Sequence, residues 1–245
     1  MYGRFIPLIK QYAKQTVVIV QPQLEKLFKN SKIVSEGVEI MTDIKEFISK
    51  YKNEKYVHIP MLDLPYPLGI DSHFIPFDEA YLTPLQPKIY NTNKLKVGIA
   101  YSGDISANYN IRNIELSEFE PLTRNENIQL YSLQVGEPSE QLKEYGDKII
   151  DLGKEFNDFI DTANAIAGLD LVITVDNVIL NLAGALGKKT YGLYNKYPNF
   201  RWFNLKGENV VWYKSVKPFQ CKKENEWSDV IKEVEECLKK DFLNG

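Results

Sequence analysis

From residue 95 onward, short apolar, β-branched runs alternate with segments whose apolar residues recur every three to four positions. Gly, Asp, Asn or Pro stands at each change of pattern. Strands this apolar are buried on both faces of a sheet, and alternating β and α elements with short connections form parallel sheets. We therefore expect a parallel, doubly wound α/β sheet. Its predicted strands are residues 95–103, 127–136, 148–153, 169–176 and 188–195, and a final helix is predicted over about 227–238.

The first 94 residues follow a less regular pattern. It predicts strands over 16–20 and 55–60, a short element over 32–37, and helices over 2–14, 23–30 and 43–50. Six prolines between residues 60 and 87 exclude a regular helix or a central strand there. We interpret this stretch as a connector between two lobes, residues 1–90 and 91–245. The last helix is a candidate to pack back on the N-terminal lobe.

Composition narrows the class of protein. The 245 residues are 44% hydrophobic and 26% charged with a net charge of −3, which suits a folded core and gives no electrostatic signal for nucleic acid. The most apolar stretch, 168–187, is interrupted by Asp170 and Asp176, so no transmembrane segment is predicted. Two cysteines and a start without a secretory leader favour a cytoplasmic location.

Several common site motifs are absent from the sequence. No three glycines fit G-x-G-x-x-G, the residues before Gly187-Lys188 do not fit a P-loop, and Ala100 replaces the first glycine of G-x-S-x-G. Two histidines and two cysteines sixteen residues apart provide no metal-ligand spacing. We expect neither a dinucleotide cofactor nor a metal ion.

The positive signal is the position of polar residues at strand ends. Ser102, Gly103 and Asp104 follow one predicted strand, while Asp176 and Asn177 follow another and precede a helix. In open α/β sheets, ligands bind beyond the carboxyl ends of the strands, where helix N-termini present N–H groups to anions. We expect these two loops to form adjoining sides of one crevice.

The sequence at these loops resembles the heptosyltransferase-like glycosyltransferases of family 9, especially the form often found behind tetratricopeptide repeats. The likeness covers nearly the whole chain and is most specific over residues 151–190. Further matching stretches are VQPQLEKLF (20–28), HIPMLDLPYPLG (58–69), Ser102-Gly103, RNIEL (112–116), SLQVG (132–136), FRWF (200–203) and WYKSVKPFQ (212–220).

The resemblance implies a GT-B architecture of two Rossmann-like lobes. It implies inverting, metal-independent transfer of a sugar from a nucleoside-diphosphate sugar to a glycan, lipid or protein acceptor, with the donor held mainly by the C-terminal lobe and no cofactor. Such a reaction requires a base for the acceptor hydroxyl and charge stabilisation for the leaving diphosphate.

Carried over residue by residue, the resemblance places donor contacts at Ser102, Gly103, Arg112, Gln134, Asp176, Asn177 and Asn181. The family's Thr and His correspond to Asn177 and Asn181, and its phosphate-binding Lys and a neighbouring Arg correspond to Ala107 and Asn110. We therefore expect backbone N–H groups, Ser102, Asn177 and Arg112 to recognise phosphate.

Family members also begin with a strand and a Gly-Asp loop that supplies the base, whereas this chain opens within the helix that follows. The resemblance thus predicts an N-terminal lobe without its first strand. An uncovered sheet edge would then favour self-association. Asp63 is the only nearby carboxylate available as a substitute base.

Two interpretations of the function follow: a glycosyltransferase, or a catalytically degenerate module that binds nucleotides or sugars or acts as a scaffold. Each residue also has a structural interpretation. Asp176 would cap a helix, Asn181 would fill space, and Arg112 would be a surface residue or a partner of Glu115. For Arg201-Trp202 and Trp212-Tyr213, packing is favoured over stacking on a nucleotide base.

Overall fold

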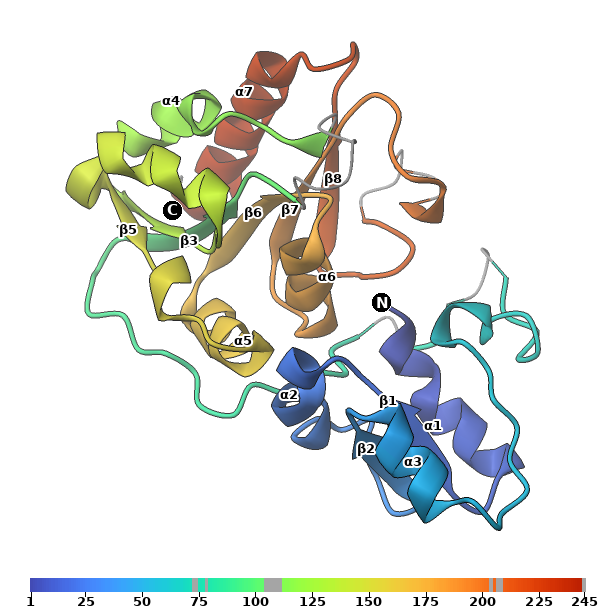
Figure 1. Ribbon diagram of the computed structural model, residues 1–245. Helices are drawn as coiled ribbons and strands as arrows, with labels where there is room; N and C mark the ends of the chain where they lie inside the picture. Colours follow the sequence, from blue (N-terminus) through green and yellow to red (C-terminus); the bar gives the residue numbers. More distant parts are fainter. Residues whose placement is uncertain (72–74, 78, 104–111, 203–204, 206–208, 244–245) are drawn as a thin grey trace.

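A parallel sheet of six strands forms the centre of the computed structural model, in the order β5-β4-β3-β6-β7-β8 (Figure 1). The structure describes residues 1–71, 75–77, 79–103, 112–202, 205 and 209–243. The strands are β3 (Leu95–Ala100), β4 (Ile128–Ser132), β5 (Ile149–Asp151), β6 (Leu171–Val175), β7 (Thr190–Tyr194) and β8 (Val216–Gln220). This sheet confirms the predicted parallel α/β architecture.

The direction in which the chain adds strands reverses between β3 and β6. β3 pairs with β4 on one side, in the register Val97 to Leu130, and with β6 on the other, in the register Val97 to Leu171. The chain proceeds from β3 to β5 toward one edge and then from β6 to β8 toward the other. In open α/β sheets, ligands bind at such a reversal, beyond the carboxyl ends of the two central strands.

Helices cover both faces of this sheet (Figure 1). On one face lie α4 (Glu120–Thr123) and α7 (Trp227–Leu238), and on the other lie α5 (Phe159–Gly168) and α6 (Val178–Ala185). Successive residues of β6 point to opposite faces of the sheet: Ile173 packs in the core on the α7 side and Val172 in the core on the α5 side.

The last helix does not pack on the N-terminal segment as expected. In α7, Val230, Ile231, Val234 and Leu238 recur at helical spacing, are at most 2% exposed, and join the core of the six-stranded sheet. The sheet offers this helix a broad apolar face, so its apolar stripe is buried there.

Besides the α-helices, the described chain has 3₁₀ and π turns, and the segment of helical period after β4, residues 139–146, falls in two of these turns, η7 and η8. The turns are η1 (Tyr2–Phe5), η2 (Lys10–Tyr12), η3 (Pro22–Leu24), η4 (Met61–Asp63), η6 (Leu116–Phe119), η7 (Glu137–Glu144), η8 (Gly146–Lys148), η9 (Gly153–Glu155), η10 (Phe200–Trp202) and the π turn η11 (Lys239–Leu243).

The N-terminal part holds a two-stranded parallel sheet. β1 (Thr16–Ile19) pairs with β2 (Val38–Met41), and the helices around it are α1 (Ile6–Ile9), α2 (Glu25–Lys29) and α3 (Ile44–Lys50). The predicted strand over 55–60 is wrong: this segment pairs with no strand of the described chain, and Val57 is 86% exposed. The short element expected over 32–37 gives way to β2, which begins at Val38.

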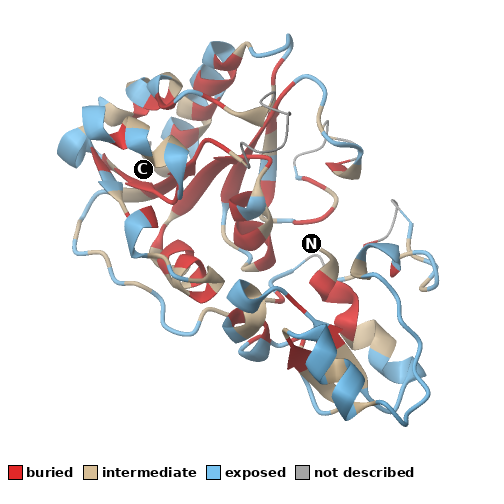
Figure 2. Ribbon diagram, viewed as in Figure 1, coloured by how far each residue is buried: buried red, intermediate tan, exposed pale blue. Residues whose placement is uncertain are grey.

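The two parts share one hydrophobic core. Phe5 and Ile6 belong to one buried cluster with Leu180 of α6 and with Trp212 and Tyr213, and Figure 2 shows buried residues both in the N-terminal helical segment and in α6. The rings of Phe5 and Trp212 lie 6.4 Å apart. Among the helices that the structure describes, none has the length and apolar character needed to span a bilayer.

Candidate functional site

The two predicted loops meet at the reversal point of the sheet. The Asn177 Nδ2 atom, just beyond β6, donates a hydrogen bond of 3.1 Å to the backbone oxygen of Ser102, just beyond β3. Gly103 donates its N–H to Asn113 Oδ1 at 2.9 Å. The carboxyl ends of adjacent parallel strands lie at the same edge of a sheet, so the strand order brings these loops together.

The side chain of Gln134 holds the backbone of the loop after β3. Its side chain is 6% exposed, and its Oε1 atom accepts hydrogen bonds from the N–H groups of Tyr101 and Ser102, at 3.2 and 3.0 Å. Its Nε2 atom donates to the backbone oxygen of Val135. With its amide engaged in this way, Gln134 shapes the loop that carries Ser102 and Gly103.

Asn177 caps α6 and changes the expected mode of anion recognition. Its Oδ1 atom accepts hydrogen bonds from the N–H groups of Ile179 and Leu180, at 2.9 and 3.2 Å, and from the Thr174 hydroxyl. The expectation that backbone N–H groups at the start of this helix receive phosphate is therefore wrong for these two residues, because the cap already satisfies them.

Asp176 is a buried carboxylate between two arginines. It is 3% exposed, and neither of its oxygens has a hydrogen-bond partner. Arg112 Nη1 lies 3.6 Å from Oδ2, and Arg201 Nη2 lies 3.7 Å from Oδ1. Arg112 Nη1 also donates to the backbone oxygen of Asp176 at 3.3 Å. The predicted capping role belongs to Asn177, and Asp176 is instead an ion-pair partner of two guanidinium groups.

Arg201 lies beside Asp176, although the sequence analysis favoured packing for it and did not place it among the donor contacts. It lies in η10 beside Trp202, and Trp202 is fully buried, so the packing role predicted for this pair holds for Trp202. The pKa of the Tyr194 hydroxyl, raised well above its ordinary value by burial, is raised further by the charge of Asp176. Two signals in the sequence pointed to Arg201: it lies in an aromatic run that follows a strand end, and it belongs to the FRWF stretch of the resemblance.

Asn181 faces the interior one turn into α6. Its Nδ2 atom donates to the backbone oxygen of Asn177 at 3.0 Å, and its Oδ1 atom accepts from the Tyr213 hydroxyl at 3.2 Å. Tyr213 stacks on the fully buried guanidinium of Arg4, whose Cζ atom lies 4.8 Å from the ring centre. Asn181 thus joins the end of β6 to the core shared with the N-terminal part.

The remaining predicted residues are not brought into this site by any described contact. Asp63 is exposed in η4, and no described hydrogen bond or ion pair joins its side chain to the residues above. Asp104, Ala107 and Asn110 lie outside the described residues. No group of three His, Cys, Asp or Glu side chains in the described chain is arranged to hold a metal ion.

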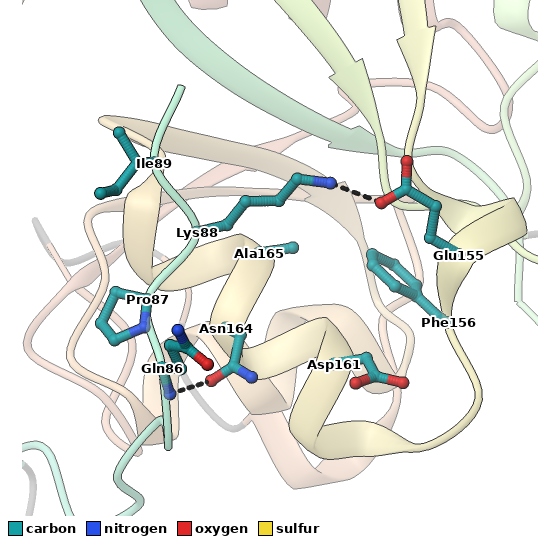
Figure 3. A pocket seen from close by; sticks show the side chains of 9 residues that line it. All are labelled: Gln86, Pro87, Lys88, Ile89, Glu155, Phe156, Asp161, Asn164 and Ala165. Carbon is teal, nitrogen blue, oxygen red and sulfur yellow. Dashed lines mark hydrogen bonds and ion pairs between the residues drawn. The ribbon is translucent and has the colours of Figure 1, made fainter. Parts of the chain in front are cut away.

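A separate cavity of about 400 Å³ lies where the connector crosses α5 (Figure 3). The Gln86 N–H donates to Asn164 Oδ1 at 2.7 Å, and Lys88 Nζ pairs with Glu155 Oε2 at 2.5 Å. None of the predicted site residues lines it. These contacts fasten the connector to the C-terminal part, and we assign the cavity a structural origin.

Comparisons with known proteins relate the chain to glycosyltransferases by fold. No protein-family model matches it. Over 130 residues it is 29% identical to protein FlbA of Caulobacter vibrioides. This alignment covers 49% of this chain and 21% of FlbA, so the chain spans about a fifth of that protein's length.

Among solved structures, the ADP-heptose LPS heptosyltransferase II of E. coli matches 98% of this chain and 95% of its own, with a TM-score of 0.60 and 10% identity. The glycosyltransferase family 9 protein of Veillonella parvula DSM 2008 gives a TM-score of 0.43 at 11% identity, over 96% of this chain and 70% of its own. The E. coli match shows the fold, an α/β architecture with Rossmann-like parallel sheets.

Proposed function

We propose that this chain is a glycosyltransferase that binds a nucleoside-diphosphate sugar between the loops after β3 and β6. The observation that carries the proposal is the contact of these loops, through Asn177 and Ser102, at the point where the strand order reverses. The fold of a heptosyltransferase over nearly the whole chain supports it. We propose a glycan, a lipid or a protein hydroxyl as acceptor.

In the proposed reaction, the acceptor oxygen bonds to the anomeric carbon on the face opposite the diphosphate, and the bond from that carbon to the diphosphate oxygen breaks with its electron pair. The hydroxyl proton passes to a base, a role that we assign to Asp63. The leaving diphosphate gains negative charge, which the neighbouring Arg112 offsets. This chemistry needs no metal ion.

Calorimetric titration with UDP-, GDP- and ADP-sugars tests donor binding. We expect one of these donors to bind the wild-type protein and to bind Asp176→Ala at least about tenfold more weakly, because Arg112 and Arg201 lose the carboxylate that pairs with both of them. Arg124→Gln is the matched control, since Arg124 pairs with Glu120 on an exposed surface. If no nucleotide sugar binds the wild-type protein, the proposal is wrong.

A second candidate function is a non-catalytic nucleotide- or sugar-binding module. The observation that favours it is the exposed position of Asp63, which no described contact joins to the site. Transfer of a labelled sugar to cell extract separates the two. If Asp63 is the base, Asp63→Asn lowers the transfer rate about a hundredfold or more and leaves donor affinity unchanged. A protein that binds the donor and transfers nothing is the non-catalytic module.

A further inference from the structure

We propose that Arg112 and Arg201 form a two-arginine clamp for the diphosphate, and that Asp176 positions these arginines rather than contacting the sugar. The inference rests on the proposed function and assigns its anion-binding step. It keeps Arg112 from the phosphate contacts expected from the sequence and adds Arg201, so that two guanidinium groups from different segments of the chain bind the diphosphate.

The first observation is the arrangement of the three charges. Arg112 approaches one oxygen of Asp176 and Arg201 approaches the other, at 3.6 and 3.7 Å. Both distances are longer than a hydrogen bond, so these contacts are ion pairs only. The carboxylate therefore accepts no hydrogen bond from either guanidinium, and their N–H donors toward it are not used up. A guanidinium has five N–H donors, and two guanidiniums beside one carboxylate leave one positive charge in excess.

The second observation is the contrast in exposure. The side chain of Asp176 is 4% exposed, whereas the side chains of Arg112 and Arg201 are each 30% exposed. A ligand that approaches this edge of the sheet from solvent therefore meets the arginines before the carboxylate. Because both carboxylate oxygens are buried without a hydrogen bond, the paired arginines are what keeps this charge tolerable at the end of β6.

The third observation is the state of the backbone donors nearby. The N–H groups of Ile179 and Leu180 are taken by Asn177, and that of Gly103 is taken by Asn113. A diphosphate at this edge of the sheet finds its charge-matched donors on Arg112 and Arg201. Planar guanidinium groups suit the phosphate geometry because they donate two parallel hydrogen bonds to one anion.

The decisive measurement uses inorganic pyrophosphate, UDP, GDP and ADP, each titrated by calorimetry beside the corresponding nucleotide sugars. We expect Arg112→Gln and Arg201→Gln each to weaken pyrophosphate, nucleotide and nucleotide-sugar binding by about tenfold or more. Increasing salt should reduce the wild-type affinity more than that of either variant, because charge pairing is screened. Arg124→Gln should match the wild type, and far-UV circular dichroism checks that each variant is folded.

Asp176→Asn separates positioning from direct contact. A positioning role weakens nucleotide and nucleotide-sugar binding by the same factor, whereas a direct contact with a sugar hydroxyl weakens only the nucleotide sugar. Equal affinity of wild type and Arg201→Gln for pyrophosphate and the nucleotides overturns the clamp even if donor binding and transfer persist. Loss of pyrophosphate binding in the arginine variants supports the clamp even if no sugar is transferred. If Asp176→Asn does not fold, the arginine variants decide alone.

Discussion

At the residue scale, short side-chain amides organise the ends of the central strands. Asn177 caps α6 and reaches across to Ser102, and Gln134 accepts two N–H groups of the neighbouring loop. Each satisfies backbone groups that would otherwise be buried without partners. In the proposed clamp, the ligand contacts at these strand ends then come from the partly exposed Arg112 and Arg201.

The two cysteines provide a prediction at the same scale. Cys221 is 3% exposed, and burial raises the pKa of its thiol to about 12, while Cys237 is partly exposed with Lys217 Nζ at 2.9 Å from its sulfur. Because the thiolate is the reactive form, we expect Ellman's reagent at about pH 8 to modify Cys237 and to spare Cys221 until urea unfolds the protein.

The Cys237→Ser variant is the control and should show no reactive thiol in the folded state. The raised pKa of Cys221 also determines how the free energy of unfolding depends on pH. The unfolded thiol titrates near about 8.5, so the free energy of unfolding falls, relative to Cys221→Ala, as the pH rises from there toward 12. Rapid reaction of both thiols in the folded protein would contradict the burial of Cys221.

At the element scale, the connector before β3 is fastened to α5. The Lys88 N–H donates to the Asn164 backbone oxygen at 2.9 Å, and the Tyr90 hydroxyl donates to that of Ala165 at 3.1 Å. Gly168 ends α5 beneath this crossing, and a Cβ atom there would lie 1.9 Å from the Lys88 backbone oxygen. The absence of a side chain at Gly168 is what allows the close approach.

Gly168→Ala should therefore force the connector away from α5. We expect a loss of about 1–3 kcal/mol in the free energy of unfolding, measured by urea denaturation. Lys88→Ala is the control: it removes only a partly exposed ion pair with Glu155 and should change stability by less than about 1 kcal/mol. A Gly168→Ala protein as stable as the wild type would mean that the connector does not lie on α5 as described.

At the scale of the whole molecule, one core joins the N-terminal part to the C-terminal sheet. Phe5, Trp202, Trp212 and Tyr213 belong to the same buried cluster, and the site at the end of β6 borders it through Asn181. Motion of one part against the other would disturb this cluster.

We expect the two parts to unfold in one cooperative transition. In a Trp227→Phe variant, fluorescence reports on Trp202 and Trp212 in the shared core, and its urea transition should coincide with that of far-UV circular dichroism. Phe5→Ala should lower the free energy of unfolding by about 3–5 kcal/mol without separating the transitions. Two resolved transitions in the parent variant would show that the parts fold independently.

Local pattern in the sequence determined much of the C-terminal part. Runs such as 169–176 and the polar residues after them are encoded by nearest-neighbour periodicity, so the central strands and the loops at their ends follow from it. The local sequence pattern predicts strands less well where pairing with a neighbouring strand decides whether a segment is a strand. β8 contains Lys217 and Pro218 and is a strand because it lies at a sheet edge, whereas the β-branched segment 55–60 has no described strand partner.

The tertiary structure decided which charged side chains meet at the candidate site. Arg112, Asp176 and Arg201 meet only because β3, β6 and η10 converge beyond one edge of the sheet, and no periodicity encodes which charges face each other across that edge. The sequence placed Asp176 at a strand end. The tertiary structure decided that two arginines pair with Asp176, because these arginines come from segments distant along the chain. It also decided that Asn177 accepts the N–H groups at the start of α6.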